Sequence, residues 1–187
     1  RHKYVKNKIN YTELEKIEKI ILEHCYKIGL IKKNYKKKKK KAIMDSLMIS
    51  FINCKMNYNK VKQFINDVEK NKIINLNFFK EGGPLFEKYI NNNWVEISRE
   101  LFSQRSIGLG TPNAASGEGE LMFIFSSKKI KKPKKGDLII GKEIIELKGE
   151  GIRISGNIHG EKFRKETLII CKKCSSLSVV SSCFLPP

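Results

Sequence analysis

A glycine and a lysine between two β-rich runs constrain the fold of this chain more than any other feature. Gly141 and Lys142 separate the run DLII from the run EIIELK. A Gly-X pair in this setting predicts a two-residue type II′ hairpin turn, and so short a turn fixes the strand register. The predicted pairs are Ile140 with Glu143, Ile139 with Ile144, Leu138 with Ile145, and Asp137 with Glu146. The segment 136–154 is therefore expected to be β structure.

The last of these pairs sets two carboxylates against each other. Residues opposed in an antiparallel ladder hold their Cβ atoms about 4.5–5.5 Å apart. Two carboxylates that close repel, unless a cation lies between them or one is protonated. Because side chains alternate along a strand, Lys148 is expected on the same face as Glu146. We therefore expect Asp137, Glu146 and Lys148 to share one surface of the hairpin.

This combination suits the hydrolysis of phosphodiester bonds. Mg²⁺ prefers oxygen ligands and is commonly held by one or two carboxylates plus a substrate phosphate. The bound metal lowers the pKa of a water and stabilises charge on phosphate oxygens. A neighbouring lysine can orient or deprotonate the attacking water, or stabilise the transition state.

Asp137, a short hairpin and then Glu146-Leu147-Lys148 resemble the D…ExK signature of the PD-(D/E)xK nuclease superfamily. The resemblance covers about residues 116–155. The sequence around these residues is also similar to stretches in uncharacterised phage or viral proteins. Gly136 stands where the family often has proline. The last helix and strand of the family's core would have to fit into residues 160–181.

The resemblance implies a restriction-endonuclease-like αβββαβ core and a divalent metal, Mg²⁺ or Mn²⁺. It also implies cleavage of nucleic acid, DNA more than RNA. In that family Asp137 and Glu146 would match the metal ligands, and Lys148 the catalytic lysine. The helix before the hairpin often supplies a further acidic residue, for which Glu120 or Glu118 would be the match. The competing interpretation is an ordinary surface hairpin with alternating charge.

The charge of the chain points to polyanions. Lys and Arg number 38 against 19 acidic residues, which gives a net charge of +19. Such a field attracts nucleic acid, although lysine-rich coding bias would raise the charge without function. An anionic membrane surface is a second possible partner. The predicted contacts to the phosphate backbone are Lys36, Lys37, Lys38, Lys131, Lys132, Lys134, Lys135 and Arg153. The alternative to a nuclease is a non-enzymatic nucleic-acid-binding or virion structural protein.

Apolar residues at helical spacing predict an α+β protein in two parts. Helices are expected over residues 11–30, 42–54, 58–71, 85–91, 94–103 and 116–127. The first would be capped by Thr12 with Glu15, and the last by Ser116. Residues 1–105 thus form a helical, basic region, and 106–187 a nuclease-like core.

Zinc, membrane insertion and secretion are not expected. Cys171 and Cys174 have zinc-knuckle spacing, and Cys183 and His159 could complete four ligands, but a second closely spaced pair is missing. No apolar run reaches the ~18 residues that span a bilayer. The N-terminal residues do not resemble a signal peptide, so we expect an intracellular protein, in host cytoplasm or nucleus or in a virion.

Overall fold

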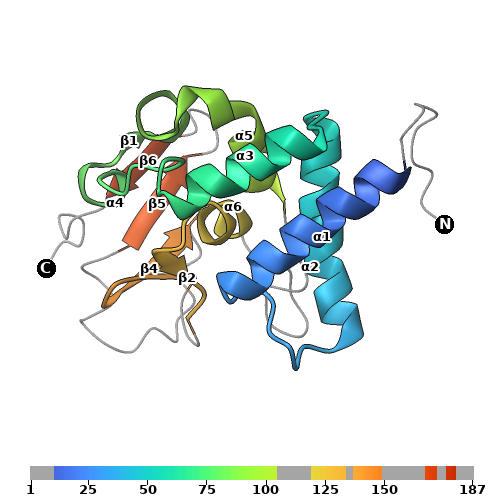
Figure 1. Ribbon diagram of the computed structural model, residues 1–187. Helices are drawn as coiled ribbons and strands as arrows, with labels where there is room; N and C mark the ends of the chain where they lie inside the picture. The colour runs from blue at the N-terminus through green and yellow to red at the C-terminus, as the bar shows by residue number, and fades with distance from the viewer. Residues whose placement is uncertain (1–10, 105–118, 134–136, 149–166, 172–175, 180–187) are drawn as a thin grey trace, which may run out of the picture.

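A computed structural model describes residues 11–104, 119–133, 137–148, 167–171 and 176–179 of the chain. Helices gather on one side of the molecule and a sheet lies on the other (Figure 1). The helical elements are α1 (Tyr11–Lys27), α2 (Lys37–Asn53), α3 (Tyr58–Glu69), α4 (Phe78–Glu81), the π-helix η1 (Leu85–Tyr89), the 3₁₀ turn η2 (Asn92–Trp94), α5 (Val95–Ser103) and α6 (Glu120–Phe125). The α+β class and the helical N-terminal part are confirmed.

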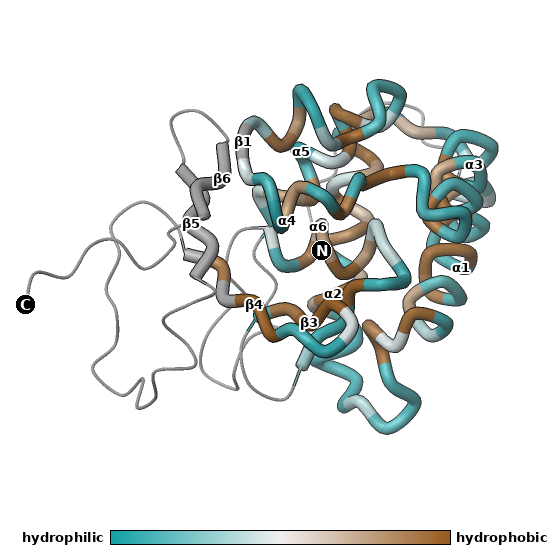
Figure 2. The backbone as a smooth tube through the Cα atoms, turned by 90° about the vertical axis from the view of Figure 1, so that its left-hand side faces the viewer, coloured by the Kyte–Doolittle hydropathy of each residue, from teal (hydrophilic) through white to brown (hydrophobic). Residues whose placement is uncertain are grey.

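The helix α6 forms the centre of the hydrophobic core. All six of its residues are buried, so it is enclosed on every face rather than half-exposed like a surface helix. The Phe125 ring contacts the rings of Phe51 and Phe64, from α2 and α3. The Phe123 ring stacks on that of Phe78, from α4. One core therefore crosses the boundary predicted at 105/106, and Figure 2 shows α6 as an apolar segment among the other helices.

The strands form a mixed sheet in the order β1-β6-β5-β4-β3-β2. Their bounds are β1 (Gly83–Pro84), β2 (Ile130–Lys131), β3 (Leu138–Ile140), β4 (Glu143–Lys148), β5 (Thr167–Cys171) and β6 (Ser176–Val179). Strands β2, β3 and β4 form an antiparallel meander. Strand β5 runs parallel to β4, and β6 returns antiparallel to pair with β1 from the helical part.

The hairpin has the register that its turn predicts. Ile140 pairs with Glu143, Ile139 with Ile144 and Leu138 with Ile145. Gly141 has a φ of 62°, as the first turn position of a type II′ hairpin requires. Ile145 and Leu147 are buried, so alternate positions of β4 face the core. Strand positions 146 and 148 consequently belong to the other face.

The predicted helices exist, with corrections at their ends. Helix α2 begins at Lys37, five residues before the predicted start at residue 42. Lysine is a good helix former, so the lysine run extends the helix toward the N-terminus. Thr12 lies inside α1, which already includes Tyr11, so the predicted cap is wrong. Helix α6 begins after Gly119, without a side-chain cap, and Ser116 lies outside the described residues. In place of the helix predicted over 85–91 there is a short π-helix, Leu85–Tyr89.

Across the described ranges, the structure contains no helix long and apolar enough to cross a membrane.

Candidate functional site

Asp137 is fixed by its side chain to the partner strand of the hairpin. It lies just before β3, and its backbone N–H donates to the Ile145 carbonyl at 3.2 Å. Its Oδ2 accepts the backbone N–H of Leu147 at 2.8 Å. The described ladder has no pair of Asp137 with Glu146; the Asp137 carboxylate instead accepts the N–H of the next residue, Leu147. This contact holds the Asp137 carboxylate beside the stretch 146–148.

A second carboxylate, Glu120, is buried at the start of α6. Its exposed fraction is 4%, and its Oε2 accepts from Lys132 Nζ. A buried carboxylate is tolerated when a cation and hydrogen bonds compensate it. Lys132, a predicted phosphate contact, supplies that charge with a side chain that is 29% exposed.

Gly119 is the reason that Glu120 can be buried. Its φ is 83°, a left-handed conformation that glycine adopts without strain. A Cβ on Gly119 would lie 2.9 Å from the Phe102 ring. The Gly119 N–H also donates to the Phe102 carbonyl at 2.8 Å. The glycine thus lets α6 begin directly against α5.

The sheet register brings these groups toward one end of the hairpin. Lys131 pairs with Ile139 in the antiparallel pair of β2 and β3. The end of β2, which leads to Lys132, therefore lies beside the start of β3, which Asp137 precedes. The pairing places the start of β3, the end of β2 and the end of β4 at the same end of the sheet, and Glu120 is joined to Lys132 there by an ion pair.

Several predicted site residues cannot be placed. The side chains of Glu146 and Lys148 are not described, although their strand positions are. Outside the described residues lie Glu118, Lys134, Lys135, Arg153, His159, Cys174 and Cys183. The backbone of Cys171 belongs to β5. Within the residues that the structure does describe, no three His, Cys, Asp or Glu side chains gather as a metal-binding group.

The N-terminal lysine run lies on the surface. Lys36 precedes α2, Lys37 and Lys38 open it, and all three are exposed. Lys39 Nζ lies 4.2 Å from the centroid of the Tyr35 ring, a cation–π contact. The position of this run leaves its ammonium groups accessible to a polyanion.

His24 of α1 is the centre of a buried polar cluster. The ring edge meets Phe125 at a centroid distance of 5.0 Å, and Nε2 lies 3.2 Å from the Phe125 carbonyl. Nδ1 lies 3.5 Å from Glu69 Oε1. Burial lowers the pKa of His24, which favours the neutral ring. The ion pair with Lys27 lowers the pKa of Glu69.

Cys25 and Cys54 are buried free thiols. Burial raises the pKa of Cys25, and raises that of Cys54 to about 11. Both thiols are therefore protonated at neutral pH, which makes them weak nucleophiles.

Comparison with known proteins returned no match to a family model, a curated protein or a solved structure.

Proposed function

We propose that this protein is a metal-dependent nuclease that hydrolyses phosphodiester bonds of nucleic acid, DNA more than RNA. The observation that carries the proposal is the hydrogen bond from the Leu147 N–H to Asp137 Oδ2. It holds one carboxylate beside the strand that bears Glu146 and Lys148, and that strand has the predicted register. Asp137 and Glu146 would bind the metal, and Lys148 would act on the attacking water.

The donor set suits Mg²⁺ or Mn²⁺. Both ions favour carboxylate oxygens, and neither needs the sulfur ligands that zinc sites commonly use. Glu120 is the further acidic residue that the resemblance implies, and its buried carboxylate is paired with the Lys132 ammonium group. A divalent ion would compete with that ammonium group for the buried oxygen. When bound, the metal would supply an activated water and offset charge on the phosphate.

The order of elements supports the same proposal. Helix α6, the meander β2-β3-β4 and the parallel strand β5 correspond to the first four elements and the last element of an αβββαβ core, whose second helix has no counterpart among the described residues. Parallel neighbours need a crossover connection of a dozen or more residues. Residues 149–166, which join β4 to β5, are long enough for that connection.

The alternative function is non-enzymatic binding of nucleic acid, as in a virion structural protein. The net charge of +19 would suffice for it, with Lys36, Lys37 and Lys38 among the exposed contacts. In that case the hairpin would be a scaffold, and binding would persist in EDTA without any cleavage.

Nicking of supercoiled plasmid with Mg²⁺ discriminates between these two functions. We expect the parent protein to nick, and Asp137→Asn and Lys148→Ala to lose nicking. The amide oxygen of Asn can still accept the Leu147 N–H, so Asp137→Asn should fold normally. Lys142→Ala is the matched control, because Lys142 is an exposed lysine in the turn of the same hairpin.

Three results would overturn the nuclease proposal. The first is parental nicking by Asp137→Asn. The second is an equal loss of nicking in Lys142→Ala and Lys148→Ala. The third is binding without cleavage under Mg²⁺ and Mn²⁺ alike.

A further inference from the structure

An open polar groove lies between two segments of the helical part, residues 71–77 and 88–93. It encloses about 840 Å³ and is lined on its remaining side by Lys129, just before β2. We propose that this groove binds a single strand of nucleic acid and leads it toward the candidate site. The inference rests on the proposed function for its substrate, but its test does not require cleavage.

The floor of the groove is held by main-chain hydrogen bonds. Ile74 and Ile90 form an antiparallel bridge. The Asn91 N–H donates to the Ile73 carbonyl at 2.9 Å, and the Asn75 N–H donates to the Tyr89 carbonyl at 2.8 Å. The three isoleucines are buried beneath it. The groove therefore has a rigid base rather than a loop that must be ordered on binding.

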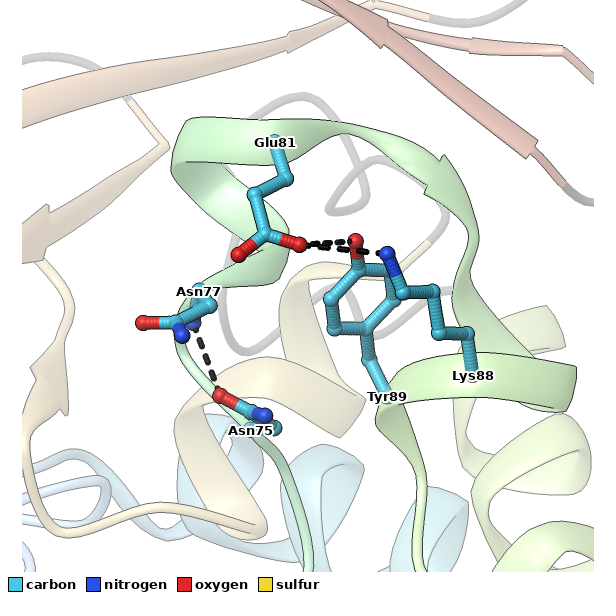
Figure 3. A network of polar contacts seen from close by, with 5 residues as sticks. All are labelled: Asn75, Asn77, Glu81, Lys88 and Tyr89. Carbon is cyan, nitrogen blue, oxygen red and sulfur yellow. Dashed lines mark hydrogen bonds and ion pairs between the residues drawn. The ribbon is translucent and has the colours of Figure 1, made fainter.

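One wall is fixed by the polar contacts of Glu81 (Figure 3). Tyr89 Oη donates to Glu81 Oε2 at 2.7 Å, and Lys88 Nζ lies 3.2 Å from the same oxygen. The hydrogen bond from Tyr89 lowers the pKa of Glu81, so this carboxylate stays ionised. The same segment is tightened by the Asn77 N–H, which donates to Asn75 Oδ1 at 3.0 Å.

The lining is rich in amides and ammonium groups. Six of the residues around the groove are asparagines: Asn71, Asn75, Asn77, Asn91, Asn92 and Asn93. Three more are lysines, Lys72, Lys88 and Lys129, and none is acidic. Asn75 Oδ1 already accepts the Asn77 N–H, and the Asn91 amide accepts the Asn93 N–H and donates to the Lys72 carbonyl. The exposed amides of Asn77, Asn92 and Asn93 can offer donors and an acceptor to the edge of a base. Lysine offers the charge that a phosphate requires.

Two of the lysines are available to a ligand. Lys72 and Lys129 are exposed, and neither forms an ion pair within the described residues. These exposed ammonium groups favour an anionic ligand.

The size of the groove suits a short stretch of a single strand. Its volume lies in the range of sites that enclose small molecules, about 300–1,000 Å³. A space of this size accommodates a few nucleotides of one strand. Lys129 lies three residues before Lys132, which pairs with Glu120 at the candidate site. Strand β2, which begins one residue after Lys129, connects this side of the groove to Lys132.

The test is fluorescence anisotropy of a labelled single-stranded oligonucleotide in EDTA, where cleavage cannot occur. The variant Lys72→Ala/Lys129→Ala removes two charges from the groove. The matched control Lys19→Ala/Lys62→Ala removes two exposed lysines from α1 and α3. We expect the groove variant to bind about tenfold more weakly than the control, with a shallower dependence on salt. Both variants change exposed side chains, and circular dichroism verifies that each is folded.

Equal losses in the two variants would overturn the groove, because they would show general electrostatic attraction. Parental affinity in the groove variant, or no binding by the parent, would also overturn it. Failure of the nuclease proposal is read separately. If Asp137→Asn nicks plasmid like the parent while the groove variant loses binding, the nuclease proposal fails and the groove stands.

Discussion

The ring of Phe125 packs at the centre of the described core and joins α6 to α1, α2 and α3. Its side chain is completely buried, and its ring contacts those of His24, Phe51 and Phe64 at centroid distances of 5.0, 5.9 and 6.2 Å. Replacing a buried phenylalanine by alanine costs about 3–5 kcal/mol. Because three rings lose their partner, we expect Phe125→Ala to lower the free energy of unfolding by about 4 kcal/mol. Phe125→Leu keeps most of the volume and should cost about 1.5 kcal/mol.

The fluorescence of Trp94 reports this loss during unfolding in urea. It is the single tryptophan of the chain, it is buried, and its ring lies 5.3 Å from that of Phe64. Tyr11→Ala is the control, because Tyr11 is 81% exposed and its removal should change stability by less than about 0.5 kcal/mol. A loss below about 1 kcal/mol for Phe125→Ala would refute the central position of α6.

Three further predictions concern stability. Burial holds the folded-state pKa of His24 below its ordinary 6.5, so the unfolded chain takes up the proton first. The free energy of unfolding, measured between about pH 7 and about pH 5, should therefore decrease as the pH falls through about 6.5. In His24→Gln it should depend less on pH. Gly141→Val should lower the melting temperature, because valine at a φ of 62° carries backbone strain of about 1 kcal/mol. No atom lies within 4 Å of the added Cβ, so a steric clash does not add to this cost. Gly119→Ala should cost more in the same melting assay, because its methyl group meets Phe102. An equal or smaller cost at Gly119 would contradict that reading.

The hairpin was predictable because its determinants are local. A Gly-X turn and alternating apolar residues fix both the turn and three ladder pairs, without information from the rest of the chain. The helices were predictable from their apolar spacing for the same reason. Their ends were less so, because the lysine run could equally have been a linker or the start of α2.

Contacts between distant segments could not be predicted. Nothing near Glu120 in the sequence indicates that it is buried, since this depends on Gly119 meeting Phe102 from another helix. The groove likewise depends on the bridge between Ile74 and Ile90, which joins two short segments without periodicity. The three consecutive asparagines at 91–93 were the one local signal for it.

Diffraction from crystals soaked in Mn²⁺, recorded at the manganese absorption edge, tests the proposed metal site most directly. We predict an anomalous peak within bonding distance of a carboxylate oxygen of Asp137 and one of Glu146, with the Lys148 ammonium group nearby. Asp137→Asn crystals should lose that peak while keeping the hairpin register. A peak elsewhere, or carboxylates of Asp137 and Glu146 that point to opposite faces of the sheet, would contradict the proposed nuclease.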